Sequence, residues 1–108
     1  MIEITIYKRP DKTFRNIQVS GHADSVEEGA DLVCCSVSVL TINLVNSLDH
    51  FTDDEFVFDQ HESLGFMSIA FPERPTEEAA LLLSSYELGV YSVAAQYGDW
   101  LKVDTEEV

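Results

Sequence analysis

The chain has 108 residues, of which 45% are hydrophobic, which suits one compact domain spanning residues 1–108 and leaves no room for a second. Its 20 acidic and 6 basic residues give a net charge of −14, which repels phosphate backbones and argues against direct nucleic-acid binding. A basic partner is favoured instead, although such a charge commonly serves only to keep a protein soluble.

The first twenty residues predict a β-hairpin. Ile2, Ile4 and Ile6 alternate with polar residues, and a turn at 9–11 precedes a second expected strand at 14–19. Because this pattern begins at once, no charged leader precedes an apolar stretch, and we expect neither secretion nor organelle import. We therefore expect a cytoplasmic protein.

A charged loop that contains glycine is expected next, with His22 at its base. Asp31 is a plausible N-cap for the helix that follows, in which apolar residues recur at helical spacing from Val33 to Leu48. The uncharged run from Leu32 to Leu48 has 17 residues, which is too short and too polar to span a bilayer. It is apolar around most of its circumference, so one face would cover the sheet and the other would need a second cover. A homodimer would supply that cover.

The second half of the chain predicts two more strands, a second helix and a short last strand. The expected elements are strands 55–61 and 64–71, linked around Glu62 and Ser63, a helix capped by Thr76 and ending near Gln96, a strand at 100–103, and a frayed tail at 104–107. The order ββαββα(β) predicts an α/β (α+β) fold, a single two-layer domain whose mixed or antiparallel sheet is covered by two helices.

A histidine and a cysteine stand at the two ends of the expected loop. A cysteine is nucleophilic only as its thiolate, and an ordinary thiol pKa of about 8.5 leaves little thiolate at neutral pH. With Asp31 as the cap, Cys34 would lie in the first helical turn, where the dipole stabilises a thiolate and free N–H groups suit an oxyanion. His22 could act as general base and then as general acid. The alternatives are a small buried cysteine and a histidine bonded to backbone.

Several neighbouring residues have simpler interpretations. Cys35 is expected to pack against the core, because a turn of about 100° carries it away from the side that Cys34 faces. A disulfide between adjacent cysteines does not fit the usual Cα separation, and neither a metal nor another cofactor is expected. Asp31 could also orient an imidazole, although its charge opposes a thiolate. Ser36 and Ser38 are expected to bond back to the helix backbone.

The spaced pattern Gly21-His22-Ala23, Gly29, Asp31-Leu32-Val33-Cys34 and Ser36 to Leu40 resembles the signature of the bacterial ribosomal-processing cysteine proteases, the Prp family. The likeness extends over nearly the whole chain, although Cys35 departs from the small, alanine-like residue of the family pattern. It implies that Cys34 and His22 form a catalytic pair. It also implies a substrate, the N-terminal extension of large-subunit ribosomal protein number twenty-seven, a basic protein, removed before ribosome assembly.

For that substrate to bind, the loop 24–30, with Asp24, Gly29 and Ala30, would have to move. Two other functions fit the same residues. One is a non-catalytic, dimeric, ribosome-associated binding module in which Cys34 is only core. The other is a thiol redox sensor that uses the more exposed of the two cysteines. One rapidly alkylated thiol would exclude the binding module, and peptide cleavage would then separate a protease from a sensor.

Overall fold

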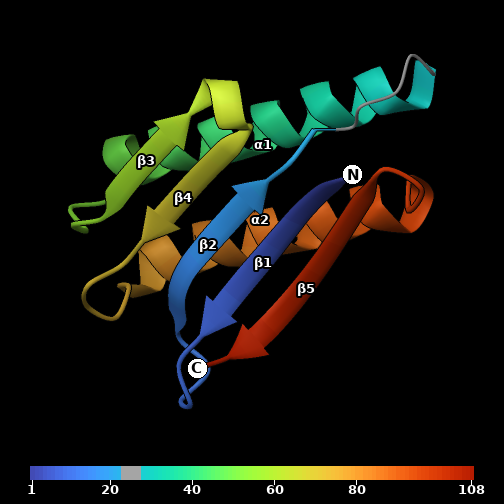
Figure 1. Cartoon of the computed structure of the whole chain (residues 1–108). Helices are drawn as coiled ribbons and strands as arrows, with labels where there is room; N and C mark the ends of the chain where they lie inside the picture. The colour runs from blue at the N-terminus through green and yellow to red at the C-terminus, as the bar shows by residue number, and fades with distance from the viewer. Residues whose placement is uncertain (23–27) are drawn as a thin grey trace.

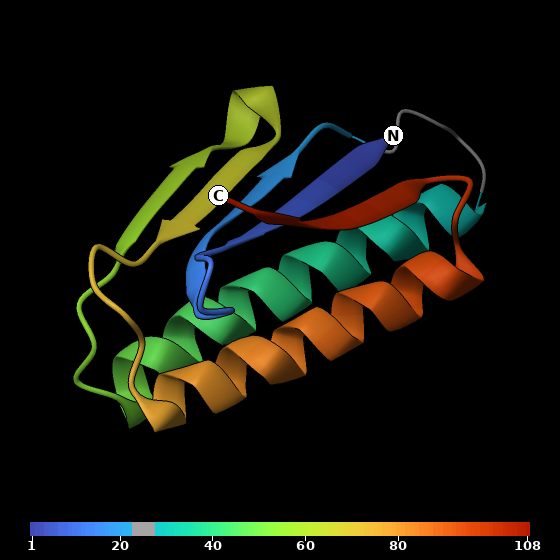
Figure 2. The ribbon, with the colours of Figure 1, turned by 90° about the horizontal axis from the view of Figure 1, so that it is seen from below.

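The computed structural model describes residues 1–22 and 28–108 as a five-stranded sheet with two helices packed on one face (Figures 1 and 2). The elements are β1 (Ile2–Lys8), β2 (Phe14–Ser20), α1 (Glu28–Phe51), β3 (Val57–His61), the 3-10 turn η1 (Glu62–Leu64), β4 (Phe66–Ala70), α2 (Glu77–Gln96) and β5 (Leu101–Glu107). This arrangement confirms the expected two-layer α+β fold.

The strand order in the sheet is β3-β4-β2-β1-β5, and β1–β5 is the parallel pair in an otherwise antiparallel sheet. The expected frayed tail at 104–107 was wrong, because β5 pairs with β1 without a break as far as Lys8 opposite Glu107. An ion pair of 2.6 Å between Lys12 Nζ and Glu107 Oε2 closes that end. The open edge of β1 therefore orders the tail in a way that local sequence does not reveal.

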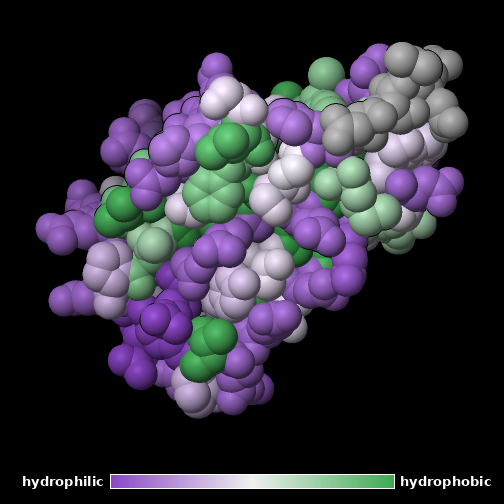
Figure 3. All heavy atoms as spheres, viewed as in Figure 1, coloured by the Kyte–Doolittle hydropathy of each residue, from purple (hydrophilic) through white to green (hydrophobic). Residues whose placement is uncertain are grey.

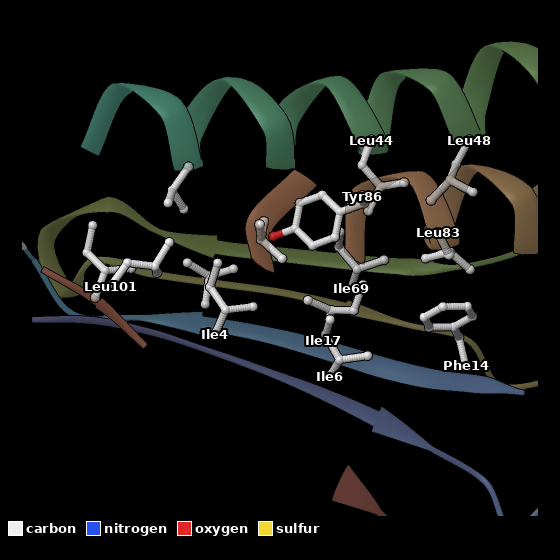
Figure 4. Packing of buried hydrophobic residues seen from close by; sticks show 14 of the residues in the cluster. Ile4, Ile6, Phe14, Ile17, Leu44, Leu48, Ile69, Leu83, Tyr86 and Leu101 are labelled. Atoms are coloured by element: carbon white, nitrogen blue, oxygen red, sulfur yellow. The ribbon is translucent and has the colours of Figure 1, made fainter. Parts of the chain in front are cut away.

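The core lies between the sheet and the helices. Ile4 and Ile6 of β1 point toward the helix layer, and Leu44 and Leu48 of α1 point back toward the sheet (Figure 4). Between the helices, the fully buried Thr41 hydroxyl meets the Tyr86 hydroxyl at 2.9 Å. Burial raises the pKa of Tyr86 to about 12, because the phenolate would lose its hydration there.

Helix α1 differs from expectation at both ends. It begins at Glu28, so the assignment of Asp31 as N-cap was wrong, and it continues to Phe51 rather than ending near Leu48. The whole stretch Gly29–Phe51 is longer than the uncharged run at 32–48: it has 23 residues and contains an 18-residue window with a mean hydropathy of 1.5, enough by length and composition alone to cross a membrane. In this fold its inner side is packed on the sheet (Figure 2). The core helix of a soluble domain has the same composition.

Helix α2 begins as the sequence predicts. The Thr76 side chain accepts a hydrogen bond from the Ala79 N–H at 3.3 Å, which makes Thr76 the N-cap. The sheet face opposite the helices is mainly hydrophilic, with hydrophobic side chains gathered toward β3 and β4 (Figure 3). Val57 of β3 and Leu64 of η1 are among the exposed hydrophobic residues, with exposed fractions of 51% and 69%.

Candidate active site

A pocket of about 320 Å³ lies between the first half of α1 and the turn that joins β3 to β4. His22 enters it just after β2, and Cys34 and Ser38 enter it from α1. Gln60, Glu62 and Gly65 form the wall opposite the helix. The two residues that the sequence singles out for chemistry therefore line one hollow.

The chain turns sharply after β2 to present His22. Gly21 has φ +91°, a left-handed backbone conformation that glycine adopts without strain. A Cβ atom at position 21 would also collide with the Met1 carbonyl oxygen. The Met1 amino group donates a hydrogen bond to the His22 carbonyl oxygen at 2.8 Å, which fixes the backbone of His22 beside the start of β1.

Cys34 is half-buried against the hydrophobic core, and Cys35 is exposed. The expectation that Cys35 packs was wrong, because the turn of about 100° between neighbours carries it to the solvent side of α1. Cys34 also lies six residues after Glu28, beyond the first turn. The free N–H groups of a helix belong to its first four residues, so Cys34 does not lie in the turn that carries the expected oxyanion donors.

The polar side chains of the pocket are not engaged with one another. Within the described ranges, the side chains of His22, Cys34, Ser38, Gln60 and Glu62 make no hydrogen bond to another described residue. His22, Ser38, Gln60 and Glu62 are exposed, and Cys34 is half-buried. A ligand that enters the pocket would therefore meet the four exposed polar side chains. Apo catalytic pairs are often separated until substrate closes the site.

The remaining candidates lie elsewhere. Asp31 is exposed and does not line the pocket, and Asp24 lies outside the described residues. Gly29 and Ala30 belong to α1, so the expected loop does not include them. Ala30 is 1% exposed, and a Cβ at Gly29 would lie 2.5 Å from Trp100 Cζ3, so both residues are held by packing.

The serines of α1 divide between two roles. The Ser36 hydroxyl donates to the Leu32 carbonyl oxygen at 2.7 Å, as expected of a serine within a helix. Ser38, expected to do the same, lines the pocket instead.

The wall made by β3, η1 and the start of β4 was missed by sequence reasoning. The available signal was Gly65, directly after the expected link at Glu62 and Ser63. Gly65 has φ +60° and ψ +40°, and its N–H donates to the Glu62 carbonyl oxygen at 3.1 Å. A glycine there reverses the chain over the pocket.

The model of a family described as "Cysteine protease Prp" matches residues 1–102. The chain belongs to the Prp family of cysteine proteases. Ribosomal processing cysteine protease Prp of Bacillus subtilis (strain 168) is 30% identical over 109 residues, covering 97% of both chains.

Two solved structures share the fold. SMU.848 from Streptococcus mutans has a TM-score of 0.89 and 28% identity, and the match covers 100% of this chain and 96% of that one. An essential ribosomal processing protease Prp from S. aureus, in complex with a substrate peptide, has a TM-score of 0.90 and 21% identity, over 97% and 99% of the two chains.

Family membership makes this chain a cysteine protease. The sequence contains two cysteines, so a Prp-type nucleophile must be Cys34 or Cys35. Of the two, Cys34 lines the pocket that also holds a histidine.

Proposed function

We propose that this Prp-family chain is an endopeptidase in which Cys34 is the nucleophile and His22 is the general base and acid. Its proposed substrate is the N-terminal extension of large-subunit ribosomal protein number twenty-seven. The observation that carries the proposal is the shared pocket, because the Cys34 thiol and the His22 imidazole are its nucleophilic and proton-transferring groups.

The reaction takes two steps. The imidazole removes the thiol proton, the thiolate sulfur bonds to the scissile carbonyl carbon, and the resulting tetrahedral oxyanion collapses as the C–N bond breaks. The leaving amine takes its proton from the imidazolium, and a thioester remains on Cys34. Water then gives a proton to the imidazole and adds to the thioester carbonyl carbon. The C–S bond breaks, the thiol regains its proton, and the carboxylic acid leaves.

The substrate assignment has three supports. The Bacillus subtilis relative is named a ribosomal processing protease, and the S. aureus Prp was solved with a substrate peptide. The net charge of −14 attracts a basic ribosomal protein before it joins the ribosome. Apolar groups such as Phe66 and Met67 line the pocket beside the polar ones, which is compatible with the short apolar, phenylalanine-bearing recognition segment that the resemblance to the Prp family implies. Processing before assembly places the reaction in the cytoplasm.

The test is to incubate the purified chain with a peptide spanning the extension of that ribosomal protein and to record mass spectra over time. The proposal expects two products whose masses sum to the substrate plus one water. A peptide of the same composition in scrambled order is the control and should remain intact. Tight binding without cleavage would instead support the binding module, and rapid thiol alkylation without cleavage would support the redox sensor.

We also propose that the protein works as a homodimer that covers the outer side of its helix layer. The two helices expose Val39 of α1 at 67% and Leu81 and Leu88 of α2 at 72% each, and a dimer interface would bury hydrophobic side chains of this kind. Sedimentation at micromolar concentration should show a dimer, and Leu81→Lys with Leu88→Lys should yield a folded monomer. A monomeric wild-type chain over that range would contradict the dimer.

A further inference from the structure

The His22 ring lies directly against the backbone of the turn between η1 and β4. A Cβ atom at position 65 would lie 2.6 Å from both Cε1 and Nε2 of His22. It would also lie 2.7 Å from the Gly21 carbonyl oxygen. Real Cβ contacts at such distances essentially do not occur, so the ring edge occupies space that only a glycine leaves open.

We propose that Gly65 is a positioning residue for His22: its bare Cα sets how far the imidazole can enter the pocket. The inference rests on the proposed dyad for its effect on catalysis. Gly65 is itself held, because its N–H donates to the Glu62 carbonyl oxygen and its φ of +60° closes η1. The imidazole thus meets a fixed backbone surface rather than a flexible side chain, which preorganises it.

The size of the effect follows from the contact. Relieving a 2.6 Å approach to an ordinary distance near 3.4 Å requires a shift of roughly 1 Å in the ring or the turn. A displacement of about 1 Å in a catalytic group can reduce turnover by about 100-fold. We therefore expect Gly65→Ala to lower kcat/KM by roughly 10- to 100-fold, mainly through kcat.

Gly65→Ala also places an alanine at a left-handed φ, so backbone strain must be separated from ring displacement. Gly65→Asn provides the separation, because asparagine tolerates this conformation better than alanine and yet carries the same Cβ. If the collision between the new Cβ and the His22 ring is what reduces catalysis, both Gly65 variants should lose peptide cleavage. Thermal unfolding should show that both variants are folded at the assay temperature. Gly89→Ala is the matched control, since its Cβ would make ordinary contacts of 3.5 and 3.6 Å with Leu40, and neither residue lines the pocket.

The decisive measurement is the NMR signal of the Cε1–H of His22, identified by its absence in His22→Ala. Gly65→Ala and Gly65→Asn should shift this signal, whereas the His50 signal, at the far end of α1, should not move. The pH profile of Cys34 alkylation in both variants should move toward that of His22→Ala. An unchanged His22 signal, or a loss of cleavage that simply follows thermal stability, would overturn the positioning role.

The same set of variants separates the two proposals. Normal cleavage in His22→Ala would refute the dyad, while the NMR shift would still decide whether Gly65 positions the ring. Loss of cleavage in His22→Ala, together with normal cleavage and an unmoved His22 signal in both Gly65 variants, would refute only the positioning role.

Discussion

Two pockets lie toward opposite ends of helix α1, and the larger one is not the candidate active site. The larger, of about 670 Å³, is lined by the end of α1 around His50 and by the segments before β3 and α2. The smaller, of about 320 Å³, holds Cys34 and His22. His50 and Cys34 are sixteen residues apart in sequence, or roughly 24 Å along the helix. The candidate active site is therefore chosen by the chemistry of the side chains in the pocket and not by the pocket's volume.

The pockets differ most in how their polar groups are used. In the larger pocket, Asp54 accepts hydrogen bonds from the Thr76 N–H at 2.8 Å and from its hydroxyl at 2.5 Å, and Arg74 donates to Asp11. In the smaller pocket, the polar side chains make no hydrogen bond to other described residues. Groups that already bond to each other hold a structure together, whereas accessible groups without such bonds can serve a ligand. The following variants test that distinction.

The largest effect is expected at Cys34. Cys34→Ala should abolish cleavage, because no other residue of the pocket can form the thioester, and the small change in volume should leave the fold intact. Cys35→Ala should retain most activity, since its side chain faces solvent. Peptide cleavage and circular dichroism of the two variants provide the measurement. The reverse pattern, with Cys35 essential, would refute the assignment.

His22→Ala is expected to have nearly as large an effect. Without the imidazole the proposed general base and acid is removed, so cleavage should be lost. The rate of Cys34 alkylation should also rise only at higher pH than in wild type. His50→Ala, in the larger pocket, and His61→Ala, exposed at the end of β3, should change neither property. Cleavage and alkylation profiles that match wild type in His22→Ala would require another base.

Residue type and spacing were enough to select the histidine and the cysteine that line the smaller pocket, but not to predict the pocket's geometry. His22 and Cys34 stand close to a predicted loop, and local patterns identify such pairs. The wall around Gly65 comes from a distant hairpin, and only strand pairing between β2 and β4 brings it to the histidine. Gly65 is a local signal for a turn, but a local pattern does not show that this turn contacts a residue so far away in sequence.

The errors in element boundaries have the same origin. Asp31 has the chemistry of an N-cap, yet the helix starts three residues earlier, where Gly29 packs against Trp100 near the other end of the chain. The polar, acidic composition at 104–107 predicts a frayed tail, yet these residues belong to β5 and pair with β1. In both cases a tertiary contact outweighs local propensity.

An intermediate effect, on stability alone, is expected at Asp54 of the larger pocket. Asp54→Ala leaves the Thr76 cap without its acceptor and should lower the free energy of unfolding by about 0.5–1.5 kcal/mol, because these hydrogen bonds are exposed and water can replace the lost carboxylate. Because this pocket is structural, kcat/KM should stay within about twofold of wild type. Asp53→Ala, an exposed neighbour that lines the same pocket, is the matched control and should change neither quantity. A tenfold loss of cleavage in folded Asp54→Ala would show that the larger pocket takes part in catalysis.

The smallest effect concerns Asp11, which holds Arg74 at the rim of the larger pocket. Hydrogen bonds from the Thr13 hydroxyl and from Arg74 hold the pKa of Asp11 well below its ordinary value of 3.8. A carboxyl with a lowered folded pKa stabilises the fold fully above its unfolded pKa, and that stabilisation is lost as the pH falls below it. Asp11→Asn should therefore unfold at slightly lower urea concentration than wild type near neutral pH. The difference should shrink as the pH drops below about 4. Asp59→Asn, a substitution of an exposed residue on β3, is the control and should show no such pH dependence. A difference in urea midpoint between Asp11→Asn and wild type that stays constant as the pH falls would mean that the charge of the Asp11 carboxylate does not contribute to stability.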